Sequence, residues 1–127
     1  IHQRGACCTF KPIYVAMLLL FYITFPDEAA ARKTADLCVE KKLAACALCF
    51  PAQSRYFWEG QMQQEGEWVA LLKTLPAAEQ ALETAVLSLH PYDIPCILRW
   101  PVAANASYQQ WVEEQITGAF ENENQSA

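Results

Sequence analysis

Two extended segments on either side of a tight turn constrain the fold of this chain more than any other feature. Residues 43–58 (LAACALCFPAQSRYFW) and 61–74 (QMQQEGEWVALLKT) are rich in apolar and aromatic side chains, and they flank Glu59 and Gly60. Gly60 can adopt the positive φ that a tight turn requires. We therefore predict a long β-hairpin with arms Leu43–Trp58 and Gln61–Thr74 and a candidate β-bulge at Gly66.

The rest of the chain alternates between the apolar periods typical of strands and of helices. The further predicted elements are a strand at 18–25, a helix at 28–42 capped by Asp27, a helix at 77–90 stopped by Pro91, a strand at 94–101 and a helix at 105–120. This order predicts an α+β fold, namely a ferredoxin-like βαββαβ sandwich with an extra C-terminal helix. We assign residues 1–17 to an N-terminal extension, 18–120 to the domain and 121–127 to a polar tail.

The predicted hairpin is too long for the predicted helices to cover. A fourteen-residue helix spans roughly 21 Å at about 1.5 Å per residue, whereas a strand of the same length spans roughly 46 Å at about 3.3 Å per residue. The distal half of the hairpin carries Tyr56, Phe57, Trp58, Met62 and Trp68. A small monomer rarely leaves that much aromatic surface in water, so we expect a closed homo-oligomer in which another subunit covers it.

The composition limits which kinds of partner and which cellular locations we expect. The chain has 127 residues and 54% hydrophobic residues, which indicates one domain with a sizeable core. Its net charge of −5, with nine Lys and Arg, argues against nucleic-acid binding. The apolar run Ile13–Phe25 is shorter than the about 20 residues of a membrane-spanning helix. We expect a cytoplasmic protein, with a mitochondrial or a membrane or secretory route as alternatives because the native N-terminus is not visible.

Six cysteines are present, and their placement favours reduced, buried thiols over a disulfide framework. Cys46 and Cys49 form a C-x-x-C sequence, but it lies in a predicted strand. Residues three apart on a strand face opposite sides, so these two thiols are not expected to bridge or to share one metal ion. The alternative is a cysteine-dependent enzyme, in which Cys46 or Cys96 is the nucleophile and His90 the base.

His90 and Cys96 have the ligand types of a soft or borderline ion such as copper or zinc. They are six residues apart, and Pro91 and Pro95 hold the connection extended. The two side chains therefore meet only if the loop doubles back, or else another subunit supplies a ligand. The alternative interpretation makes His90 the end of a helix, where a partly positive imidazole meets the negative end of the helix dipole.

Several motifs together resemble the CutA divalent-cation tolerance family. They are TFPDEAAARKTADLCVEKKLAAC, YFWEGQ followed by Glu67, LLKT, HPYDIPCI and YQQWVEE, in this order over about residues 20–117. The resemblance implies a ferredoxin-like homotrimer in which the long hairpins of adjacent subunits pair. It also implies a role in tolerance to copper and other divalent cations, without an established catalytic activity. An alternative role is a scaffold or anchoring protein that organises partner proteins at membranes.

The resemblance also implies a binding site. Seven residues are placed near crevices between subunits, where a small ligand or an ion can bind: Tyr56, Trp58, Glu67, Lys73, His90, Tyr92 and Trp111. The alternative is that these residues only build the subunit interface, which aromatic side chains often dominate. The copper ligands proposed for bacterial members fall at Ile23, Leu89 and Cys96. Of these only Cys96 has a ligand atom. Together with His90, whose ligand type was considered above, it makes up the pair of metal candidates.

Overall fold

The computed structural model describes residues 17–126, with side chains described as far as residue 116. The elements are β1 (Leu18–Phe25), α2 (Glu28–Glu40), β2 (Cys46–Trp58), β3 (Gln61–Thr74), the short 3-10 helix η1 (Pro76–Ala78), α3 (Glu79–Leu89), β4 (Ile97–Val102) and α4 (Ala106–Ser126). This is the predicted βαββαβ order with a C-terminal helix. The predicted extension, residues 1–17, lies outside the described residues except for its last position.

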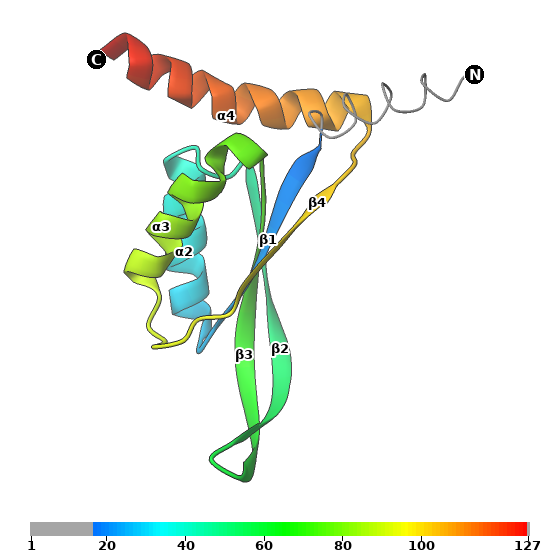
Figure 1. The fold of residues 1–127 in the computed structure, drawn as a ribbon, viewed down its shortest axis with the longest axis vertical. Coiled ribbons are helices and arrows are strands. Elements are labelled where there is room, and N and C mark those ends of the chain that lie inside the picture. Colours follow the sequence, from blue (N-terminus) through cyan, green and yellow to red (C-terminus); the bar gives the residue numbers. More distant parts are fainter. Residues whose placement is uncertain (1–16, 127) are drawn as a thin grey trace, which may run out of the picture.

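The four strands form one antiparallel sheet in the order β2-β3-β1-β4. Helices α2 and α3 pack side by side on one face of this sheet, and α4 crosses its upper end (Figure 1). The fold is therefore the predicted ferredoxin-like sandwich. Its hairpin of β2 and β3 extends well beyond the two helices, and both other strands are shorter.

The main core lies between the sheet and α2 and α3. Alternate residues of β1 point to this side because side chains alternate along a strand. The fully buried members include Phe21, Ile23 and Phe25 from β1, Ala31 and Cys38 from α2, Ala70 and Leu72 from β3, and Leu82 and Val86 from α3. A second, smaller cluster joins α4 to the sheet end through Leu18, Leu75, Ala78, Val112 and Ile116. Two separate clusters thus hold the helices in place.

Polar contacts fix the helix ends and the edge of the sheet. Asp27 caps α2 as predicted, because its Oδ1 accepts a hydrogen bond of 2.8 Å from the Ala30 N–H. Arg99 of β4 lies between two carboxylates of α3, with Nη1 2.9 Å from Glu79 Oε2 and Nη2 2.5 Å from Glu83 Oε1. The hydrogen bond to Glu83 raises the pKa of Arg99 most, and the one to Glu79 raises it further. The pairs link α3 to the outer strand of the sheet.

The hairpin differs from the prediction in two places. Gly66 is not a bulge: it pairs with Gln53 in a register that is unbroken from Cys46↔Lys73 to Trp58↔Gln61. The two arms have the same number of residues between these pairs, so no extra residue has to be accommodated. Strand β2 also starts at Cys46 rather than at Leu43, because the N–H groups of residues 43 and 44 both bond to the Cys38 carbonyl at the end of α2.

The turn of the hairpin contains a residue in an unfavourable backbone conformation. Gly60 has a φ of 79°, as predicted, but Glu59 also has a positive φ, 52°. Two positive φ values suit a type I′ turn, for which Asn-Gly is preferred because Asn tolerates this region better than other non-glycine residues. The sequence did not predict that Glu59 would occupy it.

Replacing Glu59 by Asn is expected to stabilise the protein by about 0.5–1 kcal/mol, because it relieves this backbone cost. The free energy of unfolding in urea measures the effect. Glu59→Gln is the matched control, since it removes the charge and keeps an ordinary side chain at positive φ. Equal stability of the two variants would show that the turn stores no such cost.

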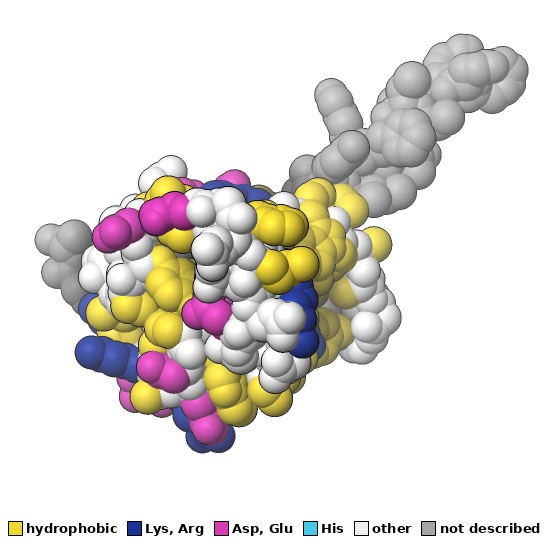
Figure 2. Space-filling view, turned by 90° about the horizontal axis from the view of Figure 1, so that it is seen from below, with side chains coloured by type: hydrophobic (Ala, Val, Ile, Leu, Met, Phe, Trp, Pro, Cys, Tyr) yellow, Lys and Arg dark blue, Asp and Glu magenta, His cyan; other side chains and the backbone are white. Residues whose placement is uncertain are grey.

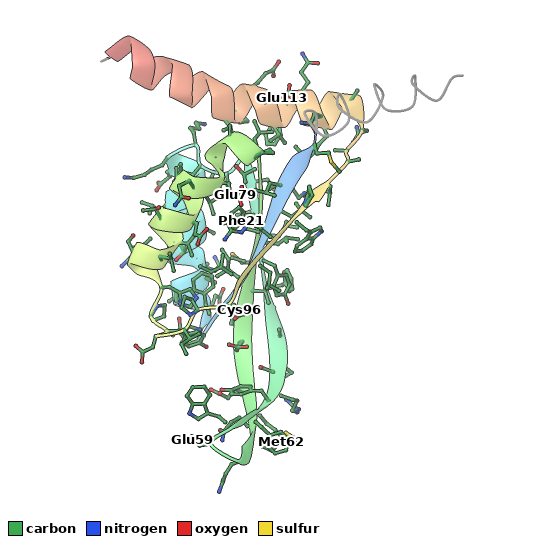
Figure 3. The ribbon with its side chains drawn as sticks, in the orientation of Figure 1. Phe21, Glu59, Met62, Glu79, Cys96 and Glu113 are labelled. Carbon is green, nitrogen blue, oxygen red and sulfur yellow. The ribbon has the colours of Figure 1, made fainter. Side chains whose placement is uncertain are left out.

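The tip of the hairpin is uncovered. Glu59 and Met62 lie at the tip, far from the helices (Figure 3), and the exposed fractions of Phe57, Trp58 and Met62 are 69%, 58% and 55%. Trp68 was expected in this group, but it packs against the main core. It pairs with Phe25 of β1 and shares its core-facing side of the sheet. The uncovered surface therefore begins beyond the end of β1.

The face of the sheet that α2 and α3 do not cover is also apolar. Leu48 and Phe50 of β2 and Leu98 and Trp100 of β4 lie on it with exposed fractions of 46%, 38%, 54% and 40%. We call these four residues the open-face patch. Seen from the hairpin end, hydrophobic side chains reach the surface in several places between acidic ones (Figure 2). Exposed apolar patches of this kind often mark sites where another protein surface binds.

Each edge strand contains a proline. Pro51 lies in β2 and Pro101 in β4, and these strands are the two edges of the sheet. Proline has no N–H to donate to a neighbouring strand, so within sheets it occurs mainly at edges. The spatial order of the strands in the sheet, with β2 and β4 outermost, explains why both residues are tolerated there.

At the C-terminus, α4 extends further than predicted. Its backbone continues to Ser126, whereas the sequence predicted a helix to residue 120 and a polar tail from 121. Glu and Gln are good helix formers, and no proline follows Gly118, so the polar residues continue the helix.

Candidate functional site

The seven predicted site residues lie in two places in one subunit. Tyr56, Glu67, His90 and Tyr92 meet where the hairpin leaves the helices, with Trp58 further out on the same arm. Lys73 lies at the other end of the sheet, close to the part of α4 that carries Trp111. Glu67 and Lys73 are six positions apart on β3, about 20 Å at about 3.3 Å per residue. A single subunit therefore does not bring the seven together.

His90 stands at the end of α3, as one interpretation of the sequence proposed. Its Nε2 is 2.7 Å from the Thr24 carbonyl oxygen, and its Nδ1 is 3.2 Å from the Tyr92 backbone nitrogen. The ring stacks on Phe25 with centroids 4.6 Å apart. Thr24 and Phe25, which end β1, are the partners that sequence reasoning missed.

Two phenols hydrogen-bond to two carboxylates on the hairpin. The Tyr92 hydroxyl donates to Glu67 Oε2 at 2.9 Å, and the Tyr56 hydroxyl donates to Glu65 Oε1. Burial and the Glu67 hydrogen bond raise the pKa of Tyr92, and the Glu65 hydrogen bond raises that of Tyr56. Both phenols thus stay protonated at neutral pH and act as donors. Glu65 was not predicted; its position two residues before Glu67, on the same side of the strand, was the available signal.

At the other end of the sheet, a cation lies against aromatic rings. Lys73 Nζ is 5.2 Å from the centroid of the Tyr108 ring, and Tyr108 stacks on Trp111 with centroids 5.6 Å apart. This is the geometry of a cation–π contact. Tyr108 was missed as a site residue, although its spacing of three from Trp111 on a helix puts the two on one side.

The metal candidates do not form a site within one subunit. The part of the chain that the structure describes contains no group of three or more His, Cys, Asp and Glu side chains able to hold a metal ion. Cys96 is exposed, and both ring nitrogens of His90 face backbone partners. Ile23, at one of the inherited ligand positions, is fully buried in the core.

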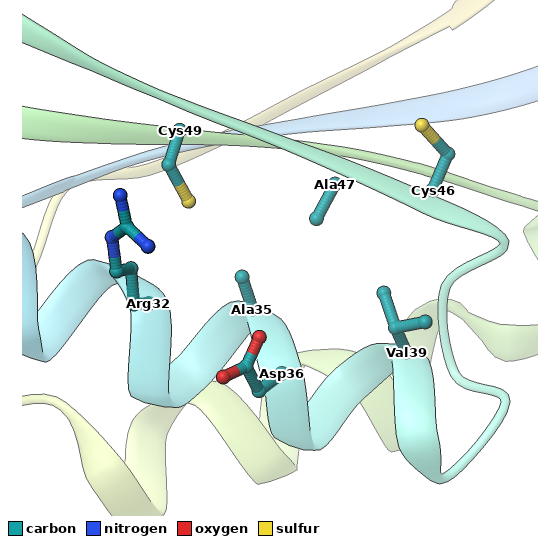
Figure 4. A pocket seen from close by; sticks show the side chains of 7 residues that line it. All are labelled: Arg32, Ala35, Asp36, Val39, Cys46, Ala47 and Cys49. Carbon is teal, nitrogen blue, oxygen red and sulfur yellow. The ribbon is translucent and has the colours of Figure 1, made fainter.

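Cys46 and Cys49 point to opposite sides of β2, as their spacing predicted. The Cys49 thiol faces α2, with Arg32 across a shallow groove, whereas Cys46 points away from the helix (Figure 4). The groove has a volume of about 430 Å³. Burial raises the pKa of Cys49, and nearby Arg32 lowers it. The two thiols are thus not placed for a shared disulfide or metal ion, while Cys7 and Cys8 lie outside the described residues.

Burial of another thiol makes stability depend on pH. Cys38 is fully buried, and burial raises its pKa from 9.0 to about 11. The unfolded chain loses this proton near pH 9 and the folded chain near pH 11, so the contribution of Cys38 is complete below pH 9 and is lost as the pH rises. We expect it to amount to about 2 kcal/mol.

The free energy of unfolding, measured between pH 8 and 11, checks this prediction. Cys38→Ala should remove the Cys38 part of the decline with pH, whereas Cys96→Ala, which changes an exposed thiol, should retain it. Identical slopes in the two variants would contradict the prediction.

The geometry does not support the proposed pairing of Cys46 with His90. Cys46 is opposite Lys73 on β3, whereas His90 contacts Thr24, which is opposite Val69. Val69 and Lys73 are four positions apart on β3, about 13 Å at about 3.3 Å per residue. A general base must be within hydrogen-bond reach of the nucleophile, so a single subunit does not form this pair.

Over the residues that the structure describes, no helix combines the length and the apolar character needed to cross a membrane.

The sequence of this chain is similar to that of known proteins. A profile of the CutA1 divalent ion tolerance protein matches residues 19–115. The chain belongs to the CutA1 family. The divalent-cation tolerance protein CutA of Citrobacter koseri is 41% identical over 108 residues, which cover 84% of this chain and 94% of the relative. That of Thermotoga maritima is 35% identical over 100 residues, which cover 78% and 99%. The resemblance seen in the sequence is thereby confirmed.

Solved CutA structures share the fold. The periplasmic divalent cation tolerance protein CutA of Archaeoglobus fulgidus superimposes with a TM-score of 0.75 at 32% identity, covering 79% of this chain and 99% of that one. CutA of Synechococcus elongatus gives a TM-score of 0.76 at 34% identity, covering 80% and 91%. These CutA relatives confirm the ferredoxin-like fold class, and the names of the curated relatives refer to tolerance of divalent cations.

Proposed function

We propose that this CutA1 family member is a non-enzymatic homotrimer of divalent-cation tolerance, which binds a metal ion or small ligand in crevices between its subunits. The observation that carries the proposal is the uncovered apolar surface, namely the open-face patch and the hairpin tip. The names of the relatives support the link to divalent cations.

A closed assembly accounts for the apolar surface. The open-face patch lies on the sheet and the uncovered rings lie on the hairpin, so two different surfaces need cover. A head-to-tail contact joins different surfaces of neighbouring copies, and it closes into a ring when the rotation between copies allows it. Three copies in such a ring each supply one surface and receive the other.

An inter-subunit crevice accounts for the division of the site residues. One end of the subunit offers phenols and carboxylates, and the other offers Lys73 with the rings of Tyr108 and Trp111. Binding pockets combine aromatic walls with a few convergent polar groups. A neighbouring copy can place further groups beside each end of the subunit. We therefore assign the ligand to the boundary between subunits.

For a metal ion, Cys96 is the leading candidate. Its thiol is exposed, and thiolates suit copper and other soft ions. His90, the second candidate, must first give up a backbone hydrogen bond before it can coordinate. Equivalent Cys96 side chains of different copies, or groups of a neighbouring copy, would have to complete the coordination.

Native mass spectrometry with and without copper tests both parts of the proposal. We expect three subunits in the absence of copper and a defined number of ions per trimer in its presence. Cys96→Ser should lower the amount of copper bound, while the matched Cys46→Ser should not. A single subunit at micromolar concentration would overturn the trimer, and copper binding unchanged by Cys96→Ser would overturn the assignment of Cys96.

A further inference from the structure

His90 is held by backbone groups from two different segments. One is the Thr24 carbonyl at the end of β1, and the other is the Tyr92 N–H in the loop that follows α3. A carbonyl oxygen can only accept a hydrogen bond, so Nε2 must carry the proton and donate it. The Tyr92 N–H can only donate, so Nδ1 must be unprotonated and accept it.

These two contacts together define one chemical state of the ring. The imidazole is neutral, with its proton on Nε2, because the partner of each nitrogen leaves no other choice. The half-buried ring also packs against two aromatic rings: Phe25 stacks on it at an interplanar angle of 16°, and Tyr92 is tilted against it with centroids 5.1 Å apart. No lone pair of the ring is left for a further partner.

Coordination of a metal ion by His90 would therefore cost one of these bonds. Binding at Nδ1 would displace the Tyr92 N–H. Binding at Nε2 would require loss of its proton and a turn away from the Thr24 carbonyl. A part-buried backbone group that loses its partner is left without a hydrogen bond, which is unfavourable. In addition, the residues that the structure describes place no pair of further metal ligands around His90.

We propose that His90 is a positioning residue, locked as the neutral Nε2–H tautomer, which fixes the loop at 90–96 over the end of β1 and is closed to divalent cations. Its effect passes through Tyr92. The same residue whose backbone N–H binds His90 places its hydroxyl 2.9 Å from Glu67 on the hairpin. His90 thus joins three segments: the end of β1, the loop and the outer part of the hairpin.

The proposal also separates the two metal candidates. Cys96 is the last residue of the same loop and is exposed, so it stays available to a soft ion, while His90 does not join it. One part of the proposal rests on the function proposed above, namely that Tyr92 and Glu67 form a wall of the ligand-binding crevice. The tautomer and the closure to metal ions stand without it.

NMR of the full chain labelled with ¹⁵N-histidine tests the tautomer directly. The chain has two histidines, so His2→Ala leaves His90 as the only one observed. At neutral pH we expect a protonated Nε2 and an unprotonated Nδ1. Addition of Zn²⁺, which is diamagnetic, to the Cys96→Ser variant should leave both ring resonances in place. A proton on Nδ1, or a metal-dependent shift of either resonance, would overturn the proposal.

Two variants divide the role of the ring between its nitrogens. His90→Asn retains an acceptor near the position of Nδ1, and His90→Gln retains a donor near the position of Nε2. We expect hydrogen exchange of the Tyr92 amide to stay near the wild-type rate in His90→Asn and to be roughly tenfold faster in His90→Gln. Equal exchange in both variants would contradict the role of Nδ1.

A third measurement tests the action through Tyr92. If His90 positions Tyr92 against Glu67, then His90→Gln and Tyr92→Phe should together lower the melting temperature by less than the sum of their separate shifts. Full additivity would contradict this role. None of these measurements requires a trimer or a bound ligand. The proposed function and the proposed role of His90 can therefore fail independently, and the experiments tell the two failures apart.

Discussion

Replacing Leu82 by alanine is expected to lower the free energy of unfolding by about 3 kcal/mol, within the roughly 2–5 kcal/mol observed for buried leucines. Leu82 is a fully buried residue of α3 and packs in the main core with residues of β1 and α2. Its truncation removes apolar contacts and leaves a cavity that the close-packed surroundings fill only partly. Urea unfolding followed by circular dichroism measures the loss.

The same helix provides a matched control. Leu87 is also in α3, but its exposed fraction is 50%. Leu87→Ala removes the same atoms from a position already in contact with water, so we expect a change within about 0.5 kcal/mol. A similar loss in both variants would mean that the orientation of α3 on the sheet is different from the one described.

Introducing a charge into the open-face patch is expected to dissociate the proposed trimer into single subunits. Leu98 lies in β4 on the uncovered face of the sheet, with an exposed fraction of 54%. If a neighbouring copy covers this face, Leu98→Glu buries a carboxylate without a partner, which costs several kcal/mol. Each of the three interfaces would carry this cost. Light scattering or native mass spectrometry reports the mass.

Leu87→Glu is the control for this experiment. It makes the same change at a similar exposed fraction, 50%, on a helix of the opposite layer. We expect it to leave the mass unchanged. Dissociation by Leu87→Glu and not by Leu98→Glu would show that the copies meet through their helices, and dissociation by neither would show that both positions lie outside the interface.

The fold was largely predictable because it depends on local periodicity. The alternation in 18–25 and 61–74 and the helical spacing in α3 are properties of short segments, and they gave the order of elements and the hairpin. The opposite orientation of Cys46 and Cys49 followed from the strand assignment alone. The bulge at Gly66 was wrong because a glycine in a strand also occurs in an unbroken ladder, and only the register of the two arms decides between these cases.

The candidate site was less predictable because its contacts join distant segments. His90 and Thr24 are 66 residues apart, and Tyr92 and Glu67 are 25 apart. No local pattern reveals that the loop after α3 folds over the end of β1. The prediction that Trp68 is uncovered was wrong for a related reason. The part of the hairpin that pairs with β1 lies in the core, and Trp68 pairs with Phe25, the last residue of β1.

The prolines at both margins of the sheet bear on the behaviour of the protein at high concentration. A strand with free N–H and C=O groups along its whole length can recruit further chains into an open-ended, fibre-like stack. Pro51 and Pro101 interrupt the row of donors on the two outermost strands. The exposed apolar surface can thus bind other copies of the protein, while the prolines keep the two edge strands from pairing with further chains without limit.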